Sequence, residues 1–146
     1  CGAFAVIRLC SYFAAYLALC ACVDFTPRVG LCWTLALVLE RALSGLAVAS
    51  FPMAKNTGLA HTFATAADRE SVQKILIVLS VLLAAALIAL GGGALVAAAL
   101  LVLWRYHHVA VKEFGGITGD LAGWFLQKAE FWMLAALAAS QWGGIL

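Results

Sequence analysis

Residues 74–104 read KILIVLSVLLAAALIALGGGALVAAALLVLW, and from Ile75 to Trp104 this run contains no charged side chain. A single helix of 31 residues would be about 46 Å long, whereas the hydrocarbon core of a bilayer is about 30 Å thick. The three glycines at 91–93 lie in the middle of the run, where they disfavour a continuous helix. The stretch therefore predicts two membrane-spanning helices joined by a tight glycine turn.

The composition of the whole chain agrees with this prediction. Hydrophobic residues make up 66% of the 146 residues, charged residues only 11%, and the mean hydropathy is +1.05. A soluble domain needs far more charge on its surface. The net charge of +2 is too small to indicate a nucleic-acid partner, and no basic stretch alternates with aromatic residues. The composition therefore indicates an integral membrane protein.

Five apolar segments are separated by polar or glycine-rich breaks. We expect an all-α fold, a polytopic membrane helix bundle with about five transmembrane helices in one membrane domain over residues 1–146. The expected spans are roughly 3–22, 29–50, 74–90, 94–111 and 119–141. Phe51-Pro52 should end the second span, because proline cannot continue a helix and restricts the residue before it. A polar loop over residues 52–73 is expected to follow.

Basic residues are distributed unevenly over the expected loops. Two loops that five spans would place on the same side have five basic residues in or beside them: Lys55, Arg69, Lys74, Arg105 and Lys112. The opposite side has only Arg28. Because lysine and arginine are enriched in cytoplasmic loops, we expect both of these loops to be cytoplasmic.

Glu40 and Arg41 lie within the second expected span, where each charge costs about 2.5–3.5 kcal/mol to insert. Adjacent residues point about 100° apart on a helix, so we expect each side chain to find a partner elsewhere. Two interpretations stay open, a functional site and a buried ion pair that fixes the register of the helix. Arg41 is the stronger functional candidate of the two.

The fifth expected span carries four residues that share one face. Asp120, Gly123, Gln127 and Glu130 fall within an arc of about 80°. A helix surrounded by lipid would not collect two carboxylates and a carboxamide on one stripe. We therefore expect this face to point into the bundle, toward a water-filled or metal-occupied cavity. Asp120 and Glu130 would be about 15 Å apart along the axis, too far to bind one ion together.

The segment before that span, residues 114–120, reads FGGITGD. Glycines permit positive φ and the close approach of a ligand. The start of a helix offers free N–H groups and a positive dipole end to a phosphate. Asp120 in the first turn can hold a divalent cation that bridges the same phosphate. The alternative is a flexible interhelical turn with an acidic residue at the helix start, and the spacing alone does not decide between them.

Cysteines and histidines give no metal signature. The five cysteines, at positions 1, 10, 20, 22 and 32, form no CxxC pair and have no histidine near them, so we interpret them as small apolar residues. His107 and His108 follow residues 104–106, WRY, which is typical of an anchor at the membrane interface. The chain starts at Cys1 without a methionine, and we expect it to begin inside a longer polypeptide.

Residues 114–130, FGGITGDLAGWFLQKAE, resemble the C-terminal signature of the cobalamin (5′-phosphate) synthase family, the adenosylcobinamide-GDP ribazoletransferases. The positions that match its Gly-Gly-x-Thr-Gly-Asp-x-x-Gly pattern and its later glutamate are Gly115, Gly116, Thr118, Gly119, Asp120, Gly123 and Glu130. Two stretches are more loosely similar. They are residues 2–7 and residues 41–63, the latter with Arg41, Pro52, Lys55, Gly58 and Phe63, where Lys55 stands at a position at which arginine is common.

The resemblance implies a Mg²⁺-dependent transferase of cobalamin biosynthesis in the prokaryotic plasma membrane, the cell inner membrane. Such an enzyme joins adenosylcobinamide-GDP to α-ribazole or its 5′-phosphate and releases GMP. The implied roles are a catalytic, metal-side carboxylate (Asp120), a phosphate pocket (Gly115, Gly116, Thr118 and Gly119), phosphate contacts (Arg41 and Lys55), and structural or pocket residues (Gly123, Gln127 and Glu130). Whether the protein forms homo-oligomers stays open.

The family's main acidic motif, of the Asp-Gly-x-x-Asp-x-x-Asp-Gly type, does not occur in residues 1–146. We therefore expect this chain to be the C-terminal portion of a longer synthase and to be inactive by itself. The alternatives are a catalytically inactive membrane subunit, including a split or decayed synthase, and a small transporter.

Overall fold

The computed structural model describes residues 2–52, 54 and 69–146, and within these ranges it contains five α-helices and no β-strand. They are α1 (Ala3–Ala21), α2 (Pro27–Ser50), α4 (Arg69–Ala89), α5 (Gly93–Phe114) and α6 (Gly119–Trp142). Helices α1, α2, α4 and α5 are long and apolar enough to cross a membrane. Helix α6 has 24 residues but does not join these four, because its charged and amide side chains lower its hydropathy. The expected all-α, polytopic membrane architecture is confirmed.

The helix boundaries differ from the expected spans by a few residues, for local reasons. Helix α2 begins at Pro27 instead of residue 29, because the Thr26 hydroxyl oxygen accepts a hydrogen bond from the Val29 N–H at 3.3 Å and proline suits the first helical position. Helix α4 begins at Arg69, so residues 69–73 are helical and not part of a loop.

The predicted glycine turn in the long apolar run is confirmed. Helix α4 ends at Ala89, helix α5 begins at Gly93, and Gly91 between them has a φ of +89°. Arg28, at the start of α2, donates from Nε and Nη2 to the Leu90 carbonyl oxygen at 3.1 and 2.7 Å. The turn is therefore held by a cation from a different helix, which satisfies a carbonyl that helix α4 leaves free.

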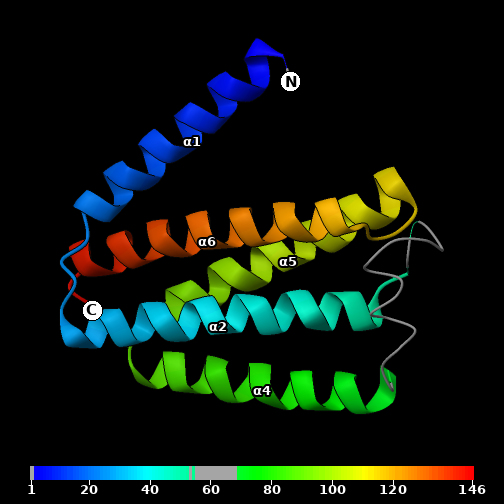
Figure 1. Cartoon of the computed structure of the whole chain (residues 1–146). Coiled ribbons are helices and arrows are strands. Elements are labelled where there is room, and N and C mark those ends of the chain that lie inside the picture. Colours follow the sequence, from blue (N-terminus) through cyan, green and yellow to red (C-terminus); the bar gives the residue numbers. More distant parts are fainter. Residues whose placement is uncertain (1, 53, 55–68) are drawn as a thin grey trace.

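Helix α2 packs on α4 and α6, and α5 packs on α6, so that α2 lies between α4 and the α5–α6 pair (Figure 1). Small side chains lie where these helices meet, and Ala36, Ala99 and Ala129 have no exposed surface. Such residues let membrane helices approach closely. Nearer the end of the bundle, the rings of Tyr106 and Phe125 stack with their centroids 5.2 Å apart. These contacts fix the relative position of α5 and α6, which carry the candidate site.

Helix α1 packs only loosely on this bundle, through contacts with α6. It buries none of its residues and runs at an angle to α6, approaching it toward the Ala21 end (Figure 1). The loop after it is tied to the end of α6, where the Asp24 N–H donates to Gln141 Oε1 at 3.0 Å and Gln141 Nε2 donates to the Asp24 carbonyl at 2.8 Å. The side of α6 that faces α1 is therefore only partly covered by the described residues.

We predict that Gly91→Val lowers the free energy of unfolding by about 1–3 kcal/mol, since a β-branched residue is strained at a φ of +89°. A Cβ at this position would also lie 3.2 Å from Arg28 Nη2 and from the Ile145 carbonyl oxygen. Unfolding in mixed detergent micelles measures the change. Gly93→Ala is the matched control, because a Cβ there meets nothing within 4 Å. Equal stability of the two variants would contradict the prediction.

Candidate functional site

Two segments far apart in the sequence meet at one end of the bundle. The Ile117 N–H donates to the Pro52 carbonyl at 2.8 Å, and the Ala54 N–H donates to the Ile117 carbonyl at 3.0 Å. Ile117 itself is buried. The chain after α2 is thus attached to the turn between α5 and α6 (Figure 1). The prediction that these two connections lie on the same side of the bundle is confirmed.

The α5–α6 turn has a backbone shape that its glycines permit. Gly115 ends α5 with a φ of +67°, and Gly116 has a φ of +153° and donates its N–H to the Ala110 carbonyl at 2.9 Å. Thr118 is the N-cap of α6, and its Oγ1 accepts a hydrogen bond from the Leu121 N–H at 3.3 Å. Gly115, Gly116 and Thr118 therefore stabilise the conformation of this turn, independently of any ligand.

Asp120 lies in the first turn of α6 and is exposed. Beside it, the first N–H groups of the helix have no intrahelical partner. A Cβ added at Gly119 or Gly123 would meet nothing within 4 Å, so packing among the described residues requires neither of these glycines. This end of α6 therefore presents a carboxylate, open backbone donors and free space, which together can accept a phosphate.

This site offers one carboxylate, that of Asp120, as a ligand for Mg²⁺. Within residues 2–52, 54 and 69–146, no group of three or more His, Cys, Asp or Glu side chains is placed to hold a metal ion. Mg²⁺ is usually bound by one or two carboxylates together with waters and substrate phosphates, not by a cage of protein ligands. Asp120 fits the role of one such ligand beside a bound phosphate.

The expectation that the polar stripe of α6 points into the bundle is wrong for most of its length. Asp120, Gly123 and Gln127 are exposed. The face of α6 that packs into the core is apolar and contains Phe125, Ala129, Met133, Leu134, Leu137 and Ala138. The stripe lies on the side facing α1, where the Tyr12 hydroxyl donates to the Gln127 carbonyl at 3.4 Å. A helical wheel shows which residues share a face, but apolar burial decides which face turns inward.

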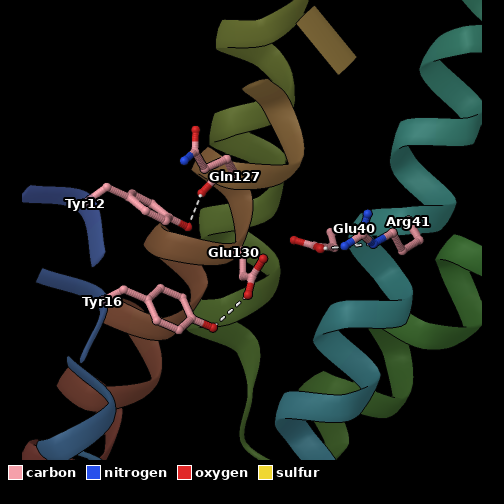
Figure 2. A network of polar contacts seen from close by, with 6 residues as sticks. All are labelled: Tyr12, Tyr16, Glu40, Arg41, Gln127 and Glu130. Atoms are coloured by element: carbon pink, nitrogen blue, oxygen red, sulfur yellow. Dashed lines mark hydrogen bonds and ion pairs between the residues drawn. The ribbon is translucent and has the colours of Figure 1, made fainter. Parts of the chain in front are cut away.

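Unlike the rest of the polar stripe, the side chain of Glu130 lies between α1 and α2. The Tyr16 hydroxyl of α1 donates to Glu130 Oε1 at 2.7 Å. On the other side, Glu40 projects from α2 toward the helix that carries Glu130 (Figure 2), close enough for the two carboxylates to interact electrostatically. Glu130 therefore has a hydrogen-bond donor on one side and a like charge on the other.

The expectation that Glu40 and Arg41 cannot pair with each other is also wrong. Arg41 Nε lies 3.5 Å from Glu40 Oε1 (Figure 2). The Glu40 side chain is fully buried, the Arg41 side chain is 63% exposed, and neither Glu40 oxygen forms a hydrogen bond within the described structure. The long arginine side chain bends back around the helix, which overcomes the 100° between the two positions. This ion pair is long, so it compensates the buried carboxylate only in part.

The structure brings together only some of the candidate residues. Gly115, Gly116, Thr118, Gly119 and Asp120 lie in one turn, beside Pro52 and Ala54. Arg41 lies nine residues before the end of α2, about 14 Å along the helix from that turn, so it belongs to the layer of Glu40 and Glu130. Lys55, Gly58 and Phe63 lie outside the described residues.

Two tyrosines of this layer were not singled out from the sequence. Tyr12 and Tyr16 are four residues apart, so they share a face of α1, and both hydroxyls contact α6 (Figure 2). Two tyrosine hydroxyls on one face of a membrane span were a signal that the sequence contained. His107, assigned to the membrane interface, packs its ring 4.5 Å from that of Phe51.

Comparison with known proteins gives two findings. The chain matches the family described as cobalamin-5-phosphate synthase over residues 1–138. The curated adenosylcobinamide-GDP ribazoletransferase of Lachnoclostridium phytofermentans is 36% identical over 140 residues, which are 94% of this chain and 52% of that protein. The chain thus spans about half the length of the curated relative that it matches. No solved structure matches it.

Substitution of the two residues of the Glu40–Arg41 ion pair should change the free energy of unfolding in opposite directions. Arg41→Gln should lower the free energy of unfolding by about 1–3 kcal/mol, because the buried carboxylate loses its counter-charge. Glu40→Gln should raise it by about 1 kcal/mol, since the buried charge and its repulsion with Glu130 are removed. Unfolding in mixed micelles measures both, with the exposed Lys112→Gln as control. A stable Arg41→Gln variant beside an unstable Glu40→Gln variant would refute this account.

Proposed function

Because the chain belongs to the cobalamin-5-phosphate synthase family, we propose that the protein joins adenosylcobinamide-GDP to α-ribazole or its 5′-phosphate and releases GMP. The product is cobalamin or its 5′-phosphate. The curated relative is an adenosylcobinamide-GDP ribazoletransferase, which supports this activity. Since the chain spans about half of that relative, we propose that it forms part of the catalytic unit and is inactive by itself.

The assignment of the site rests on the contact between the α5–α6 turn and the chain after α2. The glycine turn that ends at Asp120 lies against Pro52 and Ala54, so the two stretches that resemble the family's patterns meet in space. The turn leaves a helix N-terminus, a carboxylate and open space at the same point. A pyrophosphate is the part of adenosylcobinamide-GDP that such a site recognises.

In the proposed reaction, a hydroxyl of the ribazole attacks the phosphorus of the phosphate esterified to the cobinamide, and the hydroxyl proton passes to water. The bond from this phosphorus to the oxygen that bridges the two phosphates breaks, and GMP leaves with that oxygen. The backbone N–H groups at the start of α6 hold the non-bridging oxygens and orient the pyrophosphate for in-line attack. The Leu121 N–H donates to the Thr118 cap, which fixes the first turn of α6, so the other N–H groups at the helix start need little rearrangement during the reaction.

We further propose that Mg²⁺ is held by Asp120 together with the pyrophosphate. When bound, the ion neutralises charge that develops on the transferring phosphoryl group. Lys55, one residue beyond Ala54, is proposed as a phosphate contact. The site is proposed to face the cytoplasm in the prokaryotic plasma membrane, as the excess of basic residues at this end favours.

Asp120→Asn in the full-length protein should reduce GMP release by about 100-fold or more, as expected when a charged group that acts on the transferring phosphate is lost. The assay measures GMP and cobalamin products in proteoliposomes. Glu113→Gln is the matched control, because Glu113 is an exposed carboxylate near the same turn. Full activity of Asp120→Asn would contradict the role proposed for Asp120, whereas no GMP release by the unsubstituted full-length protein would favour an inactive membrane subunit or a transporter.

Removal of divalent cations with EDTA should abolish turnover, and added Mg²⁺ should restore it. Asp120→Glu keeps a carboxylate but moves it by one methylene, so this variant should need a higher Mg²⁺ concentration for half-maximal rate. A titration of GMP release against Mg²⁺ makes the comparison. An unchanged midpoint in Asp120→Glu would remove Asp120 from the metal site.

A further inference from the structure

An open groove of about 850 Å³ runs along α5 and α6, with Arg8 of α1 at its edge. Along α6 its lining extends from Trp124 to Ala139, fifteen residues or about 22 Å. Apart from its cations and tryptophans, its walls are aliphatic, and they are made mainly of alanines from α5 and α6. The groove is therefore long, mostly apolar and open to the surroundings of the bundle.

Three cations line this groove, namely Arg8, Arg105 and Lys128, and no carboxylate lines it. In the part of the chain that the structure describes, none of the three forms a salt bridge. The ion pairs found there use Arg41 and Lys74 instead. Three like charges on apolar walls repel one another and lack neutralisation, so the groove is complementary to an anion.

The depth of these cations limits the identity of that anion. Arg105 lies nine residues before the end of α5 and Lys128 nine residues after the start of α6, so each is about 14 Å from its helix end. A cation at such depth in a bilayer is costly unless it meets a counter-charge. Trp124 and Trp132 line the same groove, and the long side chains of arginine and lysine can extend from this depth toward the lipid headgroups.

We propose that this groove binds an anionic phospholipid, with its phosphate between Arg8, Arg105 and Lys128 and an acyl chain along the alanine wall. Basic pockets between membrane helices recognise anionic headgroups in this way. The apolar length of the groove distinguishes a lipid from a soluble phosphate, which would leave the alanine wall uncovered. The proposal concerns a surface away from the glycine turn and does not depend on the reaction proposed for that turn.

The test uses full-length protein in which Trp132 is the only tryptophan, reconstituted in phosphatidylcholine bilayers. Equal fractions of brominated phosphatidylglycerol or brominated phosphatidylcholine are added, and quenching of Trp132 is compared. We expect phosphatidylglycerol to quench more strongly. Its apparent association constant should fall about fivefold for each cation removed, in Lys128→Gln and in Arg105→Gln. Lys112→Gln, an exposed cation outside the groove, should leave the constant unchanged.

Equal quenching by the two lipids would overturn the proposal, because it would show no preference for an anionic headgroup. Absence of quenching by either lipid would overturn it as well, since the groove would then be covered by protein. Inorganic pyrophosphate added from solution provides the third comparison. Relief of the phosphatidylglycerol quenching by pyrophosphate would assign the groove to a soluble phosphate and not to a lipid.

Discussion

A peptide backbone inside a bilayer has no water to hydrogen-bond, so each N–H and C=O must be satisfied within the protein. This requirement explains both the helices and the way in which their breaks are closed. At one end, Arg28 bonds the Leu90 carbonyl, and Gln141 bonds the backbone of Asp24. At the other end, Ile117 pairs with Pro52 and Ala54. The last contact matters most for function, because satisfying the turn before α6 also brings the chain after α2 to it.

Much of the fold could be predicted because hydropathy and glycine act locally. The apolar runs gave the helices, and the glycines at 91–93 gave the break. The orientation of α6 could not be predicted in the same way. Its polar stripe and its apolar face are both evident on a helical wheel, but only the packing of Phe125 and Ala129 on the neighbouring helices shows which face turns inward. The position of Glu130 between α1 and α2 depends on those contacts.

The candidate site was predictable to the extent that it is continuous in sequence. Residues 115–120 form one turn, so their proximity needs no tertiary information. That the chain after α2 meets this turn is a tertiary fact, and it places Arg41, nine residues before the end of α2, about 14 Å along the helix from the turn. Likewise, the Glu40–Arg41 pair depends on side-chain reach and not on helix geometry. The structure therefore resolves the polar residues into two layers, one at the end of the bundle and one deep within it.

The distribution of positive charge bears on the membrane orientation, the proposed lipid site and the proposed substrate site. Of the eight basic residues in the described ranges, Arg69, Lys74 and Lys112 lie near the end of the bundle that carries the glycine turn, whereas Arg41, Arg105 and Lys128 lie about 14 Å along their helices from that end. Arg28 alone lies at the opposite end. Charge of one sign at one end of a membrane protein sets its orientation and also raises the local concentration of anions. The phosphate-binding turn that we propose at that end would gain from both effects.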